Sequence, residues 1–342
     1  AGVVAALYVT ENHRIQEGEV GELEMARAVV KHVPGSVSAR NELARTLING
    51  NQFDEAMAQA DMAIRLQPDV YKSYVYRGVS RIESGRHGQG LSDLLEAKRR
   101  HPRDAYLQYH LAMAKLALGQ SEEAVGHLEA SREIRPGNPD VHYNLGVIRV
   151  QEATSRTNRA LLEVAGKHFR EAIKREPAHS QAVCMLGEVD RQMGRTRSAI
   201  THFRRSLALD ETLAEAHHGL SLALRETQAF EESNRALGLA VYHALSQVRI
   251  GSGVTGQRIA QALDWAEELQ ERSGRNHVGS QELLGLARAS AGEFSRALVA
   301  AEGALGAPDA VDASVRRRLA LQVRAYRQRE QPPLPPVSEI VP

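Results

Sequence analysis

The sequence has few of the residue patterns that build catalytic or metal centres. Its single cysteine, Cys184, excludes an internal disulfide and a cysteine-based zinc framework. Its fourteen histidines include no His-x-x-x-His or His-Glu-x-x-His spacing, so no zinc-binding helix is expected. No serine lies in a nucleophile elbow. We therefore expect no catalytic residue, no metal and no cofactor, and we expect that the chain is not an enzyme.

The chain also lacks an excess of either charge and is poor in aromatic residues. Its 43 basic and 42 acidic residues nearly cancel, so no field would attract nucleic acid or an anionic membrane surface. Aromatic residues make up only 4% of the chain, so the core must consist mainly of Leu, Ala, Val and Ile. Helix-forming residues dominate, which predicts an all-α protein.

Proline recurs at a fixed interval in the first half of the chain. Pro34, Pro68, Pro102 and Pro136 lie thirty-four residues apart. A fixed period of this length is typical of one helical hairpin repeated along the chain, in which each unit packs on its neighbours. Such a protein works mainly by presenting a surface to a partner.

Other positions of the unit follow the same period. The eighth, twentieth and twenty-seventh positions hold small residues in every unit, such as Ala44, Ala56 and Ala63 in the first, which lets two helices approach closely. Glycines at the fifteenth position are expected to end the first helix of a pair: Gly85, Gly119, Gly194 and Gly292. Acidic residues then follow at the start of the second helix, where they match the helix dipole.

The motifs Tyr143-Asn-Leu-Gly146 and Phe53-Asp-Glu-Ala56, each in register with the periodic proline, resemble the tetratricopeptide repeat. The resemblance implies a right-handed α-solenoid of stacked antiparallel helix pairs. It divides the chain into an apolar N-terminal segment (1–14), a repeat array (15–311), a capping helix (312–330) and a proline-rich tail (331–342). Within the array we expect units at 37–70, 71–104, 105–138, 139–179, 180–213, 214–247, 248–277 and 278–311, of which 248–277 is degenerate.

Several features depart from the repeat pattern. The usual Trp at the fourth position is replaced, for example by His142 and His217, which we interpret as packing residues. Arg77 replaces Leu, so we expect a looser second unit with this arginine along the surface. Seven extra residues near 152–162 either lengthen both helices or form a projecting loop; a tolerated insertion is favoured over a specific contact point.

Two segments near the C-terminus are expected to lack regular structure. Gly251–Gly256 matches a dinucleotide-binding fingerprint but follows a helical pattern instead of a strand, so we interpret it as a flexible joint. Gln331–Pro336 cannot be helical and should be extended. We favour a disordered tail or linker there over a ligand for an aromatic groove on another protein.

The N-terminal segment leaves three origins open. The apolar stretch Ala1–Tyr8 is shorter than the roughly 20 residues that span a bilayer. It is a mature end left after export, the end of a truncated membrane helix, or the result of removing an initiator methionine. A bacterial-type periplasmic or membrane-associated location is favoured over a cytoplasmic one, and a membrane tether at this end is one interpretation.

The resemblance also implies a function and a candidate site. In this family the first helices of the pairs line a concave groove, which predicts a scaffold or adaptor that binds a protein or peptide partner. The alternative is the soluble repeat region of a membrane-anchored enzyme or export machine, since Leu7–Arg14 is similar to the junction in membrane glycosyltransferases. The predicted partner-binding residues are Asn41, Arg45, Lys72, Tyr76, Tyr106, Tyr109, His110, Met113, Tyr143, Asn144, Glu188, Arg191, His218 and Arg225.

Overall fold

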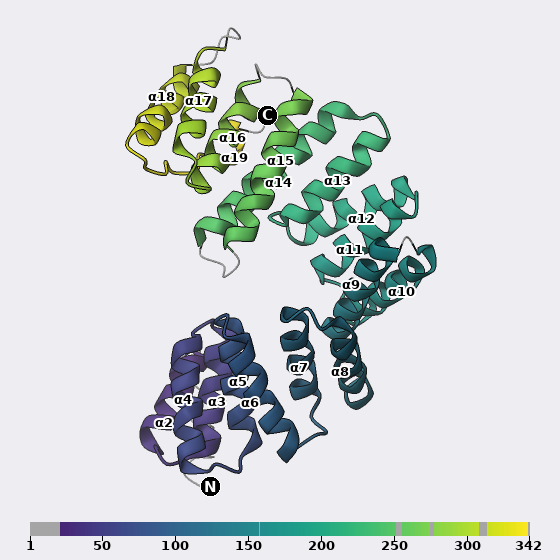
Figure 1. Ribbon diagram of the computed structural model, residues 1–342, viewed down its shortest axis with the longest axis vertical. Coiled ribbons are helices and arrows are strands. Elements are labelled where there is room, and N and C mark those ends of the chain that lie inside the picture. The colour runs from purple at the N-terminus through teal and green to yellow at the C-terminus, as the bar shows by residue number, and fades with distance from the viewer. Residues whose placement is uncertain (1–20, 157, 251–254, 274–276, 308–312, 341–342) are drawn as a thin grey trace. The chain divides into compact units, whose positions relative to one another are not determined.

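The computed structural model describes residues 21–156, 158–250, 255–273, 277–307 and 313–340, and every regular element within these ranges is an α-helix (Figure 1). The prediction of an all-α chain built from helix pairs is confirmed. The predicted N-terminal segment, 1–14, lies outside the described residues. Among the helices of the described ranges, none combines the length and apolar character needed to cross a membrane.

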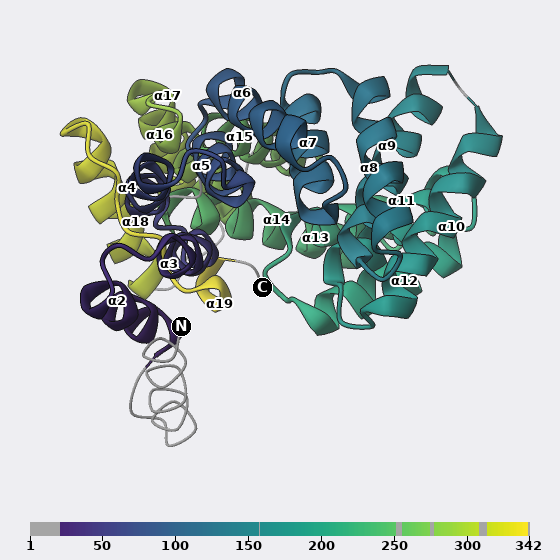
Figure 2. The same ribbon diagram turned by 90° about the horizontal axis from the view of Figure 1, so that it is seen from below.

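The chain divides into two compact units, one ending at Leu145 and the other beginning at Gly146. In unit 1 each helix packs on the next along the chain (Figures 1 and 2). Its helices are α2 (Glu22–His32), α3 (Val37–Asn49), α4 (Phe53–Leu66), α5 (Tyr71–Glu83), α6 (His87–Arg100), α7 (Ala105–Ala117) and α8 (Ser121–Ile134). The division falls within α9 (Pro139–Arg156), which is continuous across it.

Unit 2 repeats this arrangement with longer helices at two places. Its helices are α10 (Arg159–Arg175), α11 (Ser180–Gln192), α12 (Thr196–Leu209), α13 (Ala214–Glu226), α14 (Phe230–Ile250), α15 (Thr255–Ser273), α16 (Val278–Ser290), α17 (Phe294–Leu305), α18 (Ala313–Arg327) and the short α19 (Val337–Ile340). The extra residues near 152–162 lengthen both helices of their pair, because α9 has 18 residues and α10 has 17, against 13 in α7 and 14 in α8.

The turn inside six of the described helix pairs uses a left-handed backbone conformation. The four predicted turn glycines have φ between 74° and 79°, which confirms their role at the helix ends. At the same position of other pairs, Asn51 and Gln228 adopt φ of 57° and 65°. Asparagine tolerates this conformation through its short polar side chain, so the turn persists where glycine is absent.

Small residues mark places where helices approach closely, as predicted. A Cβ atom added to Gly78 would lie 3.0 Å from the carbonyl oxygen of Gly90. A Cβ added to Gly146 would lie 2.7 Å from the ring of Phe169. The space that glycine leaves is therefore filled by a neighbouring backbone or ring.

The prediction for Arg77 is wrong. Its guanidinium lies in the interface between α5 and α6, where Nη2 is 2.7 Å from Asp93 Oδ1 and Nη1 is 2.7 Å from Asp61 Oδ1. Burial disfavours the charged form of Arg77, but the hydrogen bonds with Asp93 and Asp61 outweigh it and raise its pKa. A hydrophobic contact of the usual repeat is thus replaced by an ion pair, and the second pair is not loose.

Three predictions near the C-terminus have different outcomes. Most of the joint predicted at Gly251–Gly256 lies outside the described residues, while Gly256 belongs to α15. A helix, α18, lies within residues 312–330, where a capping helix was predicted; its capping role stays a prediction. The proline-rich tail is not a free linker, because Pro332 and Pro335 are buried and Leu334 packs against the core of unit 2.

Candidate functional site

The predicted partner-binding residues fall into two groups, one in each unit. Ten of them, from Asn41 to Asn144, lie in unit 1, and four, from Glu188 to Arg225, lie in unit 2. Because each unit is a body of its own, we describe the groups separately. Unit 1 gathers its group on the first helices of successive pairs.

An aromatic cluster, Tyr76, Tyr106, Tyr109 and His110, lies on α5 and α7. The ring centroids of Tyr76 and Tyr106 are 6.3 Å apart, and those of Tyr106 and His110 are 4.3 Å apart. The Tyr109 ring meets His110 edge-on at 5.1 Å. Tyr106 is 41% exposed, whereas the other three are partly buried. Tyr106 therefore offers its ring to solvent from a platform that its neighbours hold in place.

The cluster is uncharged at neutral pH. Burial lowers the pKa of His110 to about 4 and raises the pKa of Tyr109 to about 12. Burial also raises the pKa of Tyr76 and of Tyr106. The side chains can thus offer apolar ring surface and hydrogen bonds without carrying charge, a combination common in binding surfaces.

Polar residues border the aromatic cluster. Arg45 binds Glu42 and Glu22 at 2.5 Å and 2.9 Å, so its charge is already compensated within unit 1. Asn144 Nδ2 donates to the Asp140 carbonyl at 2.9 Å and lies 3.4 Å from the Tyr109 hydroxyl. Met113 and Tyr143 are partly buried on α7 and α9.

A small cavity lies beside Asn41. It has a volume of about 250 Å³ and is lined in part by Glu42, Lys72 and Tyr76. Asn41 is only 6% exposed, and its Oδ1 atom has no hydrogen-bond partner among the described residues. A buried carbonyl oxygen without a partner is costly, and this atom has almost no exposed surface through which a bound segment could donate to it.

The predicted residues of unit 2 form two separate groups, Glu188 with Arg191, and His218 with Arg225 on either side of Glu268. Arg191 forms a two-point ion pair with Glu188 and also lies 3.4 Å from Glu226. His218 stacks on Trp265, with ring centroids 4.6 Å apart, and both His218 and Arg225 lie 3.9 Å from Glu268. The sequence did not place Trp265 here, because the degenerate unit hides its repeat position.

Side chains at the fourth position of the repeat bind the turn that precedes it, which was not predicted from the sequence. Arg40 Nε and Gln108 Nε2 donate to the carbonyl oxygens of Pro34 and Pro102, each six residues earlier. His217 Nε2 lies 2.9 Å from the Glu211 carbonyl oxygen at the same separation. Polar side chains therefore hold the turn between pairs where the family carries Trp. The packing interpretation of His217 is confirmed by its burial.

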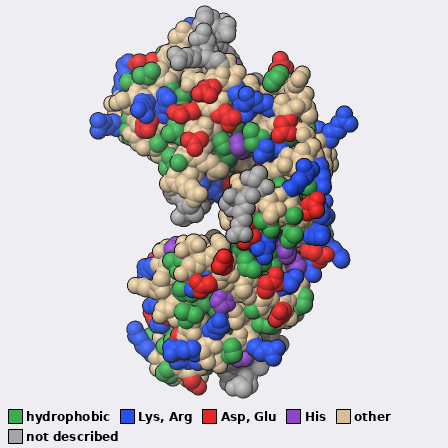
Figure 3. Space-filling view, turned by 45° about the vertical axis from the view of Figure 1, so that its right-hand side comes forward, with side chains coloured by type: hydrophobic (Ala, Val, Ile, Leu, Met, Phe, Trp, Pro, Cys, Tyr) green, Lys and Arg blue, Asp and Glu red, His purple; other side chains and the backbone are tan. Residues whose placement is uncertain are grey.

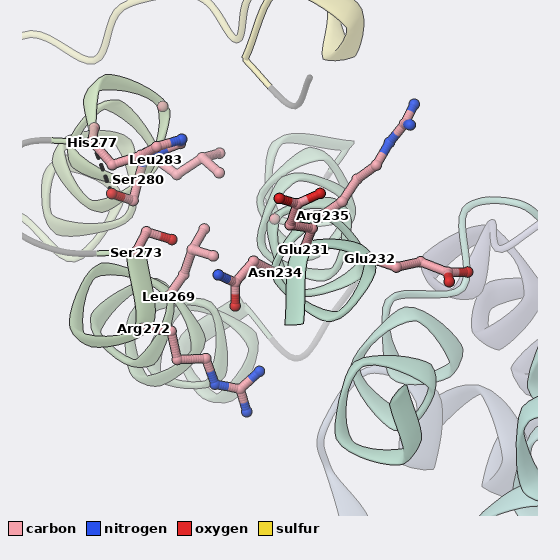
Figure 4. A pocket seen from close by; sticks show the side chains of 12 residues that line it. Glu231, Glu232, Asn234, Arg235, Leu269, Arg272, Ser273, His277, Ser280 and Leu283 are labelled. Atoms are coloured by element: carbon pink, nitrogen blue, oxygen red, sulfur yellow. Dashed lines mark hydrogen bonds between the residues drawn. The ribbon is translucent and has the colours of Figure 1, made fainter. Parts of the chain in front are cut away.

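A separate cavity of about 660 Å³ opens among α14, α15 and α16 (Figure 4). Figure 4 shows the guanidinium groups of Arg235 and Arg272 pointing to opposite sides of it. The guanidinium of Arg272 donates to Ser221 Oγ at 2.9 Å and forms an ion pair with Glu268. Charged groups do not converge here, and over the described residues no three His, Cys, Asp or Glu side chains are grouped to bind a metal.

The helix pairs and their period invite comparison with known repeat proteins. A family model described as tetratricopeptide repeat matches residues 77–148, which include α7 and most of the aromatic cluster. These residues carry the tetratricopeptide repeat. The tetratricopeptide fold explains why each first helix packs both on its own partner and on the next pair.

Solved structures share this tetratricopeptide fold. A structure of the human IFIT1 dimer with m7Gppp-AAAA aligns with a TM-score of 0.64 at 18% identity, covering 84% of this chain and 67% of that chain. The Cut9–Hcn1 hetero-tetramer of APC/C aligns with a TM-score of 0.53 at 13% identity, covering 87% and 52%. At these identities the likeness concerns the fold alone.

One curated relative of the tetratricopeptide array is human Protein O-mannosyl-transferase TMTC3. It is 25% identical over 211 residues, which is 60% of this chain and 20% of the relative. The chain therefore spans about a fifth of the length of that protein.

Proposed function

We propose that this chain is a non-catalytic scaffold that binds an extended segment of a partner protein on the first-helix face of unit 1. The aromatic cluster carries the proposal, because it joins Tyr106, a residue 41% exposed, to partly buried neighbours that fix its position. Tyrosine supplies contact area and a hydrogen bond with little loss of side-chain entropy, so it often dominates binding energy.

The bordering groups suggest the chemistry of the partner. The exposed Lys72 at the cavity beside Asn41 favours an acidic or carbonyl-rich neighbour. Basic and acidic side chains are interspersed on the face seen in Figure 3, which supports no strongly charged partner. We therefore propose a protein segment with an apolar residue opposite Tyr106, and we do not propose nucleic acid.

The test replaces Tyr106 and Tyr109 together with alanine. Partners captured by the wild-type chain are identified by mass spectrometry, and a labelled peptide from the captured partner is then titrated by fluorescence anisotropy. We expect at least about fivefold weaker binding by the double variant, since losing an aromatic anchor costs about 1 kcal/mol or more.

The matched control is Leu95→Ala on α6, because Leu95 is 42% exposed in the same unit but lies on a second helix. It should bind the peptide as the wild type does. Unchanged binding by a double variant of normal helicity would overturn the proposal, and equal losses in both variants would show that the contact is not specific to the aromatic cluster.

A second candidate function is the repeat region of a membrane-anchored enzyme. The match to Protein O-mannosyl-transferase TMTC3, although it covers only 20% of that protein, favours it. The native polypeptide would then be longer than this 37.5 kDa chain and would sediment with membranes. An antibody against the chain, used on fractionated cells, tests this; a 37.5 kDa band confined to the soluble fraction would exclude this second candidate.

A further inference from the structure

The inner face of α16 is covered, unlike that of α7. Both helices are the first of a repeat, α7 beginning at Ala105 and α16 at Val278, so their residues correspond. On α7 the positions of Tyr109, His110 and Met113 are partly exposed. The corresponding residues of α16 are at most 1% exposed: Glu282, Leu283 and Leu286. Another segment of unit 2 therefore covers the surface of α16 that corresponds to the partly exposed surface of α7.

Helix α18 covers one end of this face. Arg318 Nε and Nη2 donate to the two carboxylate oxygens of Glu282 at 2.8 Å and 3.0 Å. Gln322 Nε2 donates to the same carboxylate at 2.8 Å. A buried carboxylate needs such partners to remain charged. These contacts fix the start of the C-terminal segment beside α16.

The proline-rich tail covers the rest. After α18 the chain turns at Arg329, whose φ is 57°, and Gln331 Nε2 donates to the Ala289 carbonyl of α16 at 3.3 Å. Leu334 and Val337 then pack against the hydrophobic cluster formed by α14, α15 and α16, which includes Leu283 and Leu286. The tail predicted to be a free linker is thus docked on its own repeat array.

The tail has the features of a ligand more than those of a structural element. Pro332 and Pro335 are buried and lie three residues apart in the non-helical stretch that precedes α19. A three-residue period is that of the polyproline II conformation, which leaves its backbone free of internal hydrogen bonds. Proline-rich segments of this kind bind apolar grooves at little entropic cost, because they are extended before they bind.

We propose that the apolar face of α14–α16 is a binding surface for proline-rich extended segments, and that residues 331–337 occupy it as a tethered, displaceable ligand. The partner is a protein segment with proline and aliphatic residues spaced by three. A tether holds the tail at an effective concentration in the millimolar range, so a partner must displace it or find it released. The surface uses other residues than the aromatic cluster and does not depend on the function proposed for unit 1.

The experiment uses the full chain and a fluorescein-labelled peptide with the sequence of residues 330–338. Two release variants carry Leu334→Asp with Val337→Asp, or Leu334→Ala with Val337→Ala. The control variant carries Pro336→Asp with Ser338→Asp, which adds the same charge at exposed positions of the tail. Anisotropy titrations measure the affinity of the peptide, and circular dichroism measures helicity.

We expect the aspartate release variant to bind the peptide at least about ten times more tightly than the wild type does, because its own tail no longer competes. The alanine variant should lie between them, and the control should match wild type. A peptide carrying the same two aspartates should not bind. Absence of saturable binding to either release variant, or equal binding by all four proteins, would overturn the proposal. A wild-type dimer that the release variants lack would also overturn it, because the tail would then dock on a second copy.

Discussion

Asp93 has a side chain only 7% exposed, and it accepts hydrogen bonds from both Arg77 and Arg81. Taking a carboxylate out of water costs several kcal/mol, and its partners repay this only with good geometry. Here Arg77 Nε and Nη2 approach the two oxygens at 3.0 Å and 2.7 Å, which is such a geometry. Removing the carboxylate alone would leave the Arg77 charge partly buried with only Asp61 as a partner.

We expect Asp93→Leu to lower the free energy of unfolding by about 3–5 kcal/mol, measured by urea denaturation followed by circular dichroism. Adding Arg77→Leu, which restores the leucine usual at this repeat position, should recover most of that loss. Asp54→Leu, at an exposed pair with Arg86, is the control and should cost under about 1 kcal/mol. A double variant no more stable than Asp93→Leu alone would show that the buried charge is not the cause.

Single residues also show how far the sequence could predict the site. The repeat period located the position of Arg77, but it could not show that Asp61 and Asp93, each sixteen residues away, would meet it. In the same way it placed Tyr106 and Tyr109 on a first helix but not the ring contacts they make with His110. Their part in binding a partner stays a prediction.

At the scale of helices, the approach of α5 and α6 depends on Gly78 and Gly90. A Cβ atom on Gly90 would lie 2.6 Å from the Gly78 carbonyl oxygen and 2.6 Å from Ile82 Cγ1. The first of these neighbours is backbone, so it cannot move aside without shifting a helix. A Cβ atom added to Gly126, within α8, would meet no neighbouring side chain or helix within 4 Å among the described residues.

Gly90→Ala and Gly126→Ala should therefore change stability in opposite directions. We expect Gly90→Ala to cost about 1–3 kcal/mol through overpacking. Gly126→Ala should add about 0.5–1 kcal/mol, because alanine loses less conformational freedom than glycine in a helix. Urea denaturation of the two variants measures both effects. If Gly90→Ala proved as stable as wild type, the close approach of the two helices would be contradicted.

Helix boundaries were predictable where the period holds and less so elsewhere. Turn glycines mark the ends of α5 and α7, and Glu122 and Glu123 mark the start of α8, because each has a local cause in backbone conformation or helix dipole. The extra residues near 152–162 left two alternatives, since the sequence alone does not show whether added turns continue a helix. The composition of the tail correctly excluded a helix at Gln331–Pro336, but no local rule shows where an extended segment docks. The predicted boundaries of the individual repeats stay a proposal.

At the scale of the whole molecule, the chain is nearly neutral and keeps several histidines in its interior. Burial lowers the pKa of five of them: His110, His127, His217, His218 and His243. They occur in both units, at positions where the repeat packs one helix on another. Protonating any of them in the folded state places a charge in a poorly solvated environment.

This distribution predicts loss of stability in mild acid. A histidine whose pKa is lower in the folded state binds more protons when unfolded, so its stabilising contribution is present above pH 6.5. It is lost as the pH falls from about 6.5 toward the folded value, which is about 4 for His110. By pH 5, His110 alone should account for a loss of about 1–2 kcal/mol.

The measurement is the urea midpoint of the wild-type chain and of His110→Gln at pH 7 and pH 5. Carboxylates also titrate in this range, so the informative quantity is the difference between the two proteins. We expect His110→Gln to be less stable than wild type at pH 7, where it lacks the ring packed between Tyr106 and Tyr109, but to lose less stability on acidification. His32→Gln removes an exposed histidine of α2 and serves as the matched control. An equal acid loss in wild type and His110→Gln would show that His110 is protonated in the folded chain without cost, and the aromatic cluster would then carry a charge that the proposed partner segment must accommodate.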